Sequence, residues 1–345
     1  MNEKNAKHNP LISVLCLTYN HKNFIKQCLD GFVMQKTNFD FIAYVGDDCS
    51  TDGTTEIVKE YEYKYPNRIK GIYHTTNTGG EQNFFDTANA CKSKYVALCE
   101  GDDYWVDEYK LQKQVDFLES NPDYAICFHP TKIICDGFEF QKPDGIIPTK
   151  KAIKKGFTFE RALEDYFMHT SSVMYRWEFY NKKIEDFYPK GIISGDIYLH
   201  ILHAKKGKIK MLPGIMSVYR RNPSSVMACN VVSKDEPLLK YGLQYLKLYD
   251  FVYKNITNSS QIYLNNVIIP NLNEIIDVYY RNKKFRELEY VHRTYSEYID
   301  MAFLARKTSL DKLKRKHKKY KKLFEIALYF LILENIFLLV LFFIM

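Results

Sequence analysis

The stretch "YVALCEGDDYW", residues 95–105, decides the fold because it joins a buried strand directly to a cluster of acids. Its first five residues are apolar and predict a strand that is covered on both faces. Glu100, Asp102 and Asp103 follow within four positions, where like charges repel each other and burial is costly. A divalent cation relieves both costs, and Mg²⁺ or Mn²⁺ held by such oxygen ligands commonly clamps a diphosphate. The alternative is that one Asp caps a following helix.

Three similar strands precede this one in the sequence. Residues 11–19, 40–46 and 69–74 are apolar runs separated by segments with helical spacing, which gives the order βαβαβαβ. This order predicts a doubly wound, mostly parallel, Rossmann-like sheet. Each strand is followed by a polar cluster, and ligands of such sheets bind at the carboxyl ends of the strands. Turn formation alone explains any one cluster, but four clusters at one edge predict a binding site.

The rest of the chain predicts further strands around 125–135 and 172–176, then mostly helices. Near the end of the sequence, a segment with ten Lys or Arg and one Asp precedes an almost wholly apolar run. We therefore predict four parts: a domain of residues 1–230, a helical region of 231–305, a polybasic segment of 306–322 and an apolar tail of 323–345.

Composition and motifs argue against several other classes of protein. The net charge of +8 is concentrated in residues 306–322, so the remaining chain lacks the basic face of a nucleic-acid-binding domain. No GxxxxGK[ST] loop is present, and no GxGxxG follows the first strand, which disfavours an ATPase or a dehydrogenase. The eight cysteines form no CxxC pair and are expected to be free thiols in a reducing compartment. The polar start of the sequence predicts no secretory signal.

The motifs, in their order and spacing, resemble those of glycosyltransferase family 2, whose members have the GT-A fold. The resemblance covers roughly residues 10–225 and rests on "TYNH" (18–21), "GDDCSTDGT" (46–54), "NTGG" (77–80), "CEGDDYWVDEYKLQKQVDFLESNPDY" (99–124) and "SGDIYLHILHAKKGKI" (194–209). It implies an α/β GT-A domain that moves a sugar from a nucleoside-diphosphate sugar to an acceptor, with inversion and with a divalent metal ion.

The resemblance also implies the residues that bind the nucleotide-sugar: Thr18, Tyr19, Asn20, Asp48, Glu100 and Asp102. The ring of Tyr19 would lie by the nucleobase as a stacking surface, and Asp48 would bind the base or the ribose. Asp102 and Asp103 would hold the Mg²⁺ or Mn²⁺ ion. Glu100 stands where the family's DxD motif has its first Asp, a departure that leaves the metal-binding acids in place.

Two further positions follow from the same resemblance. Asp196 matches the acid that serves as general base, which takes the proton of the acceptor hydroxyl as it attacks the anomeric carbon. The alternative for Asp196 is the N-cap of a helix over 197–206, and the two roles are compatible. Arg220 or Arg221 would add positive charge near the diphosphate or shape an acceptor loop, and the alternative is a solvated surface arginine.

The apolar tail predicts attachment to a membrane, because about 20 apolar residues suffice to cross a bilayer. The preceding basic segment would attract anionic lipid on the cytoplasmic side. We therefore expect a catalytic domain at the cytoplasmic face of the cell membrane, with a glycan or lipid-linked acceptor in cell-surface polysaccharide or lipooligosaccharide synthesis. The alternative for the tail is a helix packed on a partner chain.

Two other functions stay open at this point. The first is a non-catalytic, membrane-attached protein that binds a nucleotide-sugar, which the release of nucleotide from a donor would exclude. The second is a nucleotidyltransferase, which would be expected to carry a Gly-rich loop with Arg and Lys after the first strand. The sequence "TYNHKNF" at that place lacks such a loop.

Overall fold

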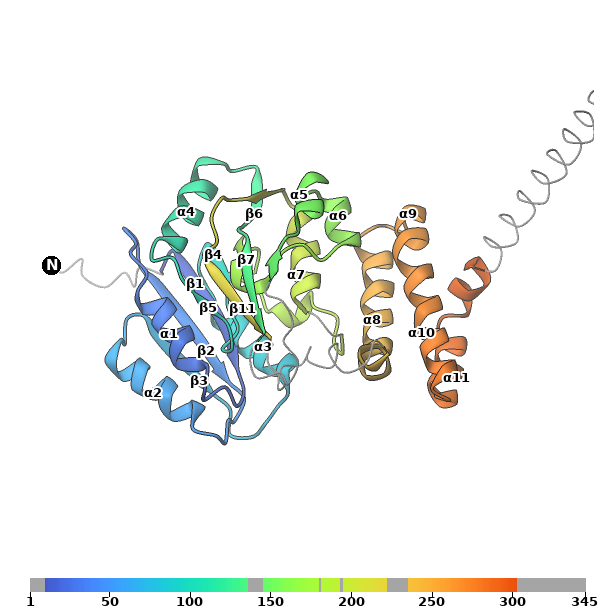
Figure 1. The fold of residues 1–345 in the computed structure, drawn as a ribbon, viewed down its shortest axis with the longest axis horizontal. Coiled ribbons are helices and arrows are strands. Elements are labelled where there is room, and N and C mark those ends of the chain that lie inside the picture. Colours follow the sequence, from blue (N-terminus) through green and yellow to red (C-terminus); the bar gives the residue numbers. More distant parts are fainter. Residues whose placement is uncertain (1–9, 136–144, 180, 193–194, 222–234, 303–345) are drawn as a thin grey trace, which may run out of the picture. The chain divides into compact units, whose positions relative to one another are not determined.

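The computed structural model describes residues 10–135, 145–179, 181–192, 195–221 and 235–302. Its main sheet has seven strands (Figure 1). In order across the sheet they are β10 (Lys208–Met211), β6 (Tyr124–Phe128), β9 (Met174–Arg176), β4 (Tyr95–Leu98), β1 (Ile12–Thr18), β2 (Phe41–Asp47) and β3 (Ile69–Tyr73). Neighbouring strands are parallel except where β9 pairs with β4 and with β6. The predicted mostly parallel sheet is confirmed.

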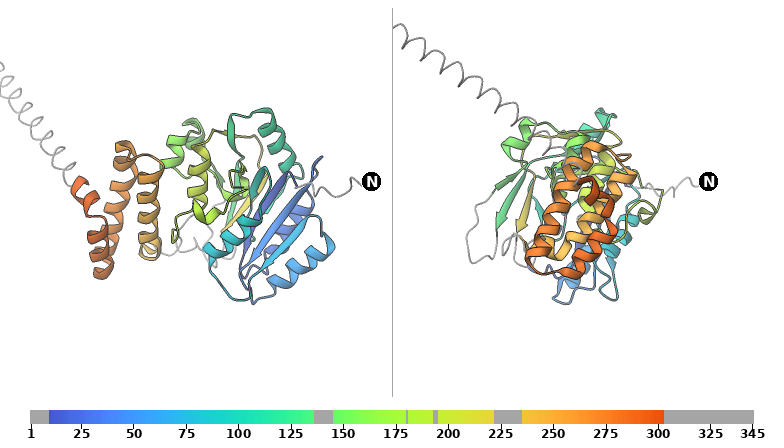
Figure 2. Two further views of the ribbon diagram at one scale, coloured as in Figure 1. Left: turned by 180° about the vertical axis from the view of Figure 1, so that it is seen from behind. Right: turned by 90° about the vertical axis from the view of Figure 1, so that its right-hand side faces the viewer.

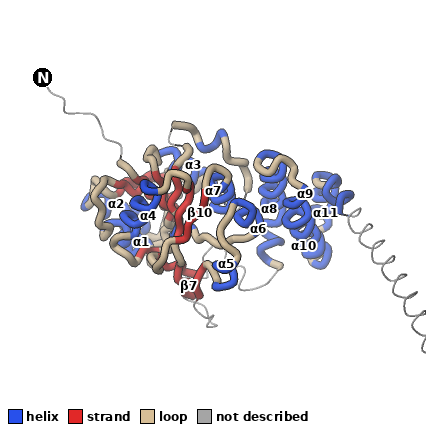
Figure 3. The backbone as a smooth tube through the Cα atoms, turned by 90° about the horizontal axis from the view of Figure 1, so that it is seen from above, coloured by secondary structure: helices blue, strands red, loops and turns tan. Residues whose placement is uncertain are grey.

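Alternate residues of the central strands are buried against different helices. Ile12, Val14 and Cys16 of β1 belong to a core shared with α1, α2 and α4. On the other face, α3 approaches β2 so closely that a Cβ on Gly46 would lie 2.0 Å from the Thr87 hydroxyl. The strands, red in Figure 3, thus lie between helices on both sides, which Figure 2 shows from behind. These helices are α1 (Ile25–Val33), α2 (Thr54–Lys64), α3 (Gly80–Ala90) and α4 (Lys110–Ser120).

A second sheet has four strands in the order β5-β11-β7-β8. The strand expected over 125–135 is in fact two strands in different sheets, because Pro130 interrupts it and has no N–H for the ladder. The acids of residues 100–103 lead directly into β5, so the alternative that they cap a helix is wrong. The four strands are β5 (Tyr104–Trp105), β11 (Ser217–Arg221), β7 (Thr131–Cys135) and β8 (Gly145–Ile147).

The remaining elements are mostly helical, and the chain divides into two units, Met1–Ile268 and Ile269–Met345. In the first unit they are α5 (Lys150–Lys154), α6 (Phe159–Glu164), η1 (Thr170–Ser172), η2 (Ile184–Asp186), α7 (Gly195–Ala204), α8 (Glu236–Asn255), α9 (Gln261–Tyr263) and η4 (Leu264–Ile268). Of these, α7 packs against β6 and α6. In the second unit α10 (Ile269–Arg281) packs against α11 (Phe285–Thr294). The prediction of a helical region near the end of the domain is confirmed for residues 235–302.

Several predictions fall outside the described residues. They are the domain boundary at 230, the polybasic segment 306–322 and the apolar tail 323–345. Within the part of the chain that the structure describes, no helix has both the length and the apolar character needed to cross a membrane. The seven cysteines found there are all free thiols, as expected.

Candidate active site

The strand order predicts a ligand-binding crevice at the carboxyl ends of β1 and β4. The order runs from β1 through β2 to β3 on one side and to β4 on the other, so the chain reverses its winding at β1. Loops that leave neighbouring strands on opposite sides of such a point open the crevice in which doubly wound proteins bind ligands. The loop after β1 begins at Thr18, and the loop after β4 carries the acids of residues 100–103.

The two loops touch at Gly101. Its N–H donates to the carbonyl of Leu17 at 2.9 Å, which holds the acidic loop against β1. A Cβ at Gly101 would lie 2.8 Å from Thr18 Oγ1 and 2.9 Å from His21 Nδ1, so only glycine fits here without a shift. Both of these buried polar atoms lack a hydrogen-bond partner among the described residues. The close approach therefore leaves two polar atoms available at the base of the crevice.

The predicted residues of the first loop are placed by contacts with the loop after β2. Asn20 has a left-handed backbone with φ of 55°, and its side-chain oxygen accepts the N–H of Thr51 at 2.9 Å. Its own N–H donates to Ser50 Oγ at 2.9 Å. Tyr19 stays 45% exposed, so one face of its ring is available for a flat ligand. The motif 18–21 therefore presents an aromatic ring at the crevice on a loop that is tied down at both sides.

Asp48 is buried and fixes the glycine-rich loop after β3. One carboxylate oxygen accepts the N–H of Thr78 at 2.7 Å and its hydroxyl at 2.9 Å. The other oxygen accepts the N–H of Gly79 at 2.9 Å. Gly79 has φ of 86°, a conformation that favours glycine, and it directly precedes α3. The structure thus shows Asp48 as the residue that shapes the "NTGG" loop, and its predicted contact with a base or ribose stays a prediction.

Glu100, Asp102 and Asp196 come together although they are far apart in the sequence. Burial, and after it the negative charges of Asp102 and Asp196, raise the pKa of Glu100 to about 8. Asp102 also acts on His21, whose pKa burial lowers while the charges of Asp102 and two other acids oppose the shift. The negative charges of these three acids repel each other, and a cation bound at this place would stabilise the arrangement.

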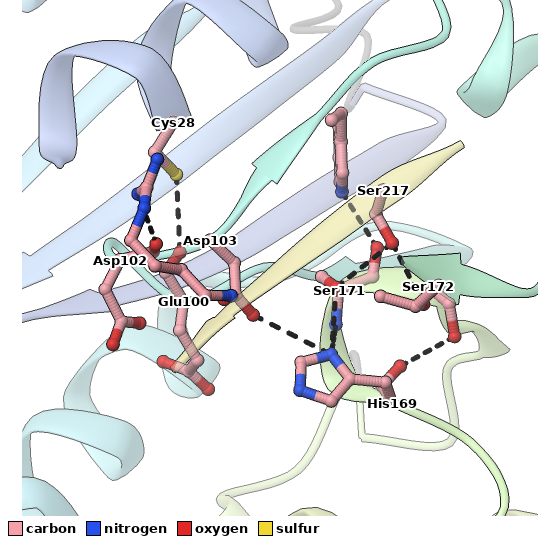
Figure 4. A network of polar contacts seen from close by, with 11 residues as sticks. Cys28, Glu100, Asp102, Asp103, His169, Ser171, Ser172 and Ser217 are labelled. Atoms are coloured by element: carbon pink, nitrogen blue, oxygen red, sulfur yellow. Dashed lines mark hydrogen bonds and ion pairs between the residues drawn. The ribbon is translucent and has the colours of Figure 1, made fainter. Parts of the chain in front are cut away.

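Asp103 points into the protein instead of into the crevice. Its buried carboxylate accepts the N–H of Arg220 at 2.9 Å, and its second oxygen lies 3.7 Å from His169 Nδ1. Figure 4 shows Asp103 directed toward His169, while the carboxylates of Glu100 and Asp102 are directed away from it. His169 Nδ1 also lies 2.9 Å from Ser171 Oγ, which donates to Ser217 Oγ at 3.1 Å. This buried chain of polar groups anchors the acidic loop to the second sheet.

Arg220 completes this anchor. Its guanidinium donates to the carbonyl of Asp102 at 2.7 Å and to Gln27 Oε1 at 2.6 Å. It also lies 4.8 Å from the ring centre of Phe24 and 5.0 Å from that of Tyr104. Arg220 is therefore a buried arginine that links β11 and α1 to the acidic loop, and the alternative of a solvated surface arginine does not apply to it. Arg221 is exposed and lies 5.5 Å from the ring centre of Tyr219.

Asp196 lies in the first turn of α7, beside residues that sequence reasoning missed. The hydroxyl of Tyr166 is hydrogen-bonded to Asp196; burial of this hydroxyl first, and then the charge and the hydrogen bond of Asp196, raise its pKa. Behind it, the hydroxyl of Tyr175 lies 2.6 Å from His200 Nδ1. Neither Tyr166 nor His169 lies in a recognisable sequence motif. Their place in the site is evident only once the fold brings distant segments together. His21 could have been found, since it stands in the "TYNH" motif.

The carboxylates of the crevice fit a divalent cation. Mg²⁺ is commonly held by one or two carboxylates together with the phosphates of a substrate, and Glu100 and Asp102 supply two hard oxygen donors. Asp103, which was predicted as a ligand, has one oxygen on the Arg220 N–H and the other facing His169. Within the described residues no group of three or more His, Cys, Asp or Glu side chains is arranged to hold a metal by itself. A site here would need donors from the substrate.

Comparison with known proteins bears on this arrangement. Residues 13–227, which include every acid of the crevice, match the profile of Glycosyl transferase family 2. The chain belongs to this family. The resemblance seen in the motifs is confirmed, and membership in this family supports the expectation of a glycosyltransferase enzyme.

Relatives cover parts of the chain. An uncharacterized protein of Mycobacterium tuberculosis is 38% identical over 215 residues, which are 62% of this chain and 60% of that protein. The poly(ribitol-phosphate) beta-glucosyltransferase of Bacillus spizizenii is 34% identical over 116 residues, 32% of this chain and 17% of that enzyme. The chain thus matches less than two thirds of the length of these relatives.

A solved structure shows the same fold. The mannosyltransferase PcManGT from Pyrobaculum calidifontis, in complex with GDP-Man and Mn²⁺, has a TM-score of 0.50 and 14% identity to this chain. The alignment covers 86% of this chain and 84% of that one. At this identity the likeness concerns the fold alone.

Proposed function

We propose that this protein transfers a sugar from a nucleoside-diphosphate sugar to a glycan or lipid-linked acceptor, with inversion at the anomeric carbon. The observation that carries the proposal is the convergence of Glu100, Asp102 and Asp196 at the crevice between β1 and β4. The two acids at the end of β4 would lie by the diphosphate, and the acid of the distant helix α7 would serve as the base. Relatives with named transferase activities, such as the glucosyltransferase of Bacillus spizizenii, support the reaction class.

The donor would bind along the loops after β1, β2 and β3. Tyr19 offers its exposed ring to the nucleobase, as in the stacking of flat rings generally. The N–H groups at the start of α3 and the "NTGG" loop held by Asp48 form the wall on the β2 side. Because Asp48 accepts three hydrogen bonds from that loop, it would act on the donor chiefly by keeping the wall in place.

Asp196 would take the proton of the acceptor hydroxyl. It interacts with Tyr166, and its position in the first turn of α7 places it near the positive end of the helix dipole. A base held in one orientation lowers the entropic cost of reaching the reactive geometry. Glu100 and Asp102 would hold Mg²⁺ or Mn²⁺, and such an ion, when bound, offsets the charge that develops on the departing diphosphate.

The direct test is a panel of nucleotide-sugars, including UDP-glucose and GDP-mannose, assayed for metal-dependent release of nucleoside diphosphate. We expect release from at least one donor and its loss in excess chelator. The variant Asp196→Asn should slow single-turnover transfer while leaving donor affinity nearly unchanged, because a general base acts in the transition state. Donor binding without any release would favour the non-catalytic alternative, and release unaffected by chelator would contradict the metal.

We also propose that the chain works at the cytoplasmic face of the cell membrane. The sequence of residues 306–345, basic and then apolar, supports this location, although these residues lie outside the described part of the chain. Deleting residues 306–345 should move the protein to the soluble fraction and leave donor hydrolysis intact. A truncated protein that still sediments with membranes would contradict the proposal.

A further inference from the structure

A cavity of about 270 Å³ lies next to the proposed general base and has no part in the chemistry described so far. Its walls come from the segment around α5 and from α6 and the residues after it. Tyr166 lines it, and the hydroxyl of the same residue is hydrogen-bonded to Asp196. A single tyrosine side chain therefore separates the cavity from the base that would accept the acceptor's proton.

The cavity has a positive balance of charge. Lys151, Lys155 and Arg161 line it together with one acid, Asp165, which leaves two positive charges uncompensated. Asp165 accepts from Arg161 Nη2 at 2.9 Å and lies 3.6 Å from Lys155 Nζ. The hydrogen bond from Arg161 is the main reason that the pKa of Asp165 is lowered, so this acid stays ionised. Lys151 forms no ion pair with any residue that the structure describes.

Arg161 gives the cavity a fixed wall. Its guanidinium donates to the carbonyl of Ala152 at 2.8 Å and to that of Gly156, and it lies 4.9 Å from the ring centre of Phe167. These contacts tie α6 to the end of α5 without using the lysines. Lys151 and Lys155 are four residues apart and exposed, so both ammonium groups can be reached from solvent, although Lys155 also faces Asp165.

We infer that this cavity binds a phosphate group of the acceptor and thereby places the acceptor hydroxyl at Asp196. The inference rests on the proposed function, since it names the acceptor class of the same site. Two lysines act on phosphate as point charges, and this suits a group whose position relative to the sugar is set by a flexible linkage.

The chain offers a matched control on the same short helix. Lys150 and Lys154 are also exposed lysines four residues apart, but they do not line the cavity. We would titrate inorganic pyrophosphate, without divalent ions, into the full-length protein by calorimetry. The samples are the wild type, Lys151→Gln with Lys155→Gln, and Lys150→Gln with Lys154→Gln. We expect the lining pair to weaken binding at least about tenfold and the control pair to change it less than about twofold.

Each other outcome overturns the inference. Equal binding by all three proteins would show that the anion binds elsewhere. An equal loss of affinity in both variants would show that the anion responds only to the overall positive charge of the helix. No binding by the wild type would show that the cavity binds no phosphate. Donor hydrolysis, in which water replaces the acceptor, should be unchanged in both variants. Failure of hydrolysis in the wild type would contradict the proposed function and leave the pyrophosphate result standing by itself.

A second ligand distinguishes the sources of the phosphate. Farnesyl diphosphate in detergent carries the same diphosphate on a lipid chain. Affinity about tenfold higher than that of pyrophosphate, and lost in the Lys151→Gln, Lys155→Gln protein, supports a lipid-linked acceptor. Equal affinity of the two ligands, with the same loss, supports a phosphate within a soluble or polymeric acceptor.

Discussion

The acids after β2 and the acids after β4 stand at the same edge of one sheet, yet their surroundings are opposite. Asp47 and Asp48 accept hydrogen bonds from Ser50, Thr55, Thr78 and Gly79, all from their own or the next loop. Glu100 has its pKa raised to about 8 by burial and by the charges of Asp102 and Asp196. The acids after β2 accept hydrogen bonds from the chain and shape its loops, whereas the acids after β4 are held against each other, an arrangement that a bound cation would stabilise.

The largest expected effect separates the two groups by activity. Asp102→Asn should lower transfer at least about a hundredfold, because loss of a carboxylate that balances a diphosphate through a cation removes several kcal/mol of transition-state stabilisation. Its melting temperature should stay the same or rise, since one of the repelling charges is gone. The measurement is nucleotide release alongside a thermal melt, with the exposed Asp116→Asn as control. If Asp102→Asn turned over as fast as the wild type, the two groups of acids would not differ in their roles.

The reverse pattern is expected for Asp48→Asn. Its amide nitrogen would face either the N–H of Gly79 or the N–H of Thr78, both of which need an acceptor. An unsatisfied buried donor costs about 1–3 kcal/mol, so the free energy of unfolding should fall by that amount in a denaturant titration. Thr78→Ala, which removes only the hydroxyl contact, should cost less. Stability equal to wild type in Asp48→Asn would show that Asp48 does not build the loop.

Asp103 follows β4 like the acids of the second group, but it accepts a hydrogen bond from the chain like those of the first. Two substitutions decide to which group it belongs. Asp103→Asn keeps an oxygen for the N–H of Arg220, so activity should stay within about tenfold of wild type. Asp103→Ala leaves that donor without an acceptor and should lower stability by about 1–3 kcal/mol. Nucleotide release and unfolding curves for both variants make the test. If Asp103→Asn loses as much activity as Asp102→Asn, Asp103 belongs with the ligand-binding acids after all.

The last expected effect is a pH dependence of stability, which changes no activity. Because the pKa of Glu100 is about 8 in the folded chain and 4.5 is its ordinary value, the folded state binds a proton that the unfolded state releases between these limits. The stability that this proton gives is complete below about pH 4.5 and is lost as the pH rises to about 8. In metal-free buffer, Glu100→Gln should therefore gain melting temperature relative to wild type from pH 5 to pH 8. A difference in melting temperature that does not change with pH would contradict the raised pKa of Glu100.

The sequence allowed the sheet and the edge of the site to be predicted, because both depend on local patterns. The four apolar runs and their polar ends have the periodicity of buried parallel strands, and the acids follow one of them directly. The pattern could not show in which direction each acidic side chain points. Asp102 and Asp103 are neighbours in sequence, but Asp103 turns inward because β11, more than a hundred residues later, brings an N–H to it. Tyr166 meets Asp196 only through the packing of α6 and α7.

In the main sheet as the structure describes it, only β9 is antiparallel to its neighbours, and this has a consequence for how the protein is made. Strands β1 to β4 can pair as soon as the chain has been synthesised to Leu98, but β6 cannot join them until β9, at Met174–Arg176, fills the place between. During translation, which proceeds from the N-terminus, the half of the molecule that carries Asp48 and the acidic loop would form early. The half that carries Asp196 and the cavity could form only after roughly another hundred residues have been synthesised. The newborn chain would thus have the proposed donor side in place before it has the proposed base, and sugar transfer would have to wait until synthesis has passed β9.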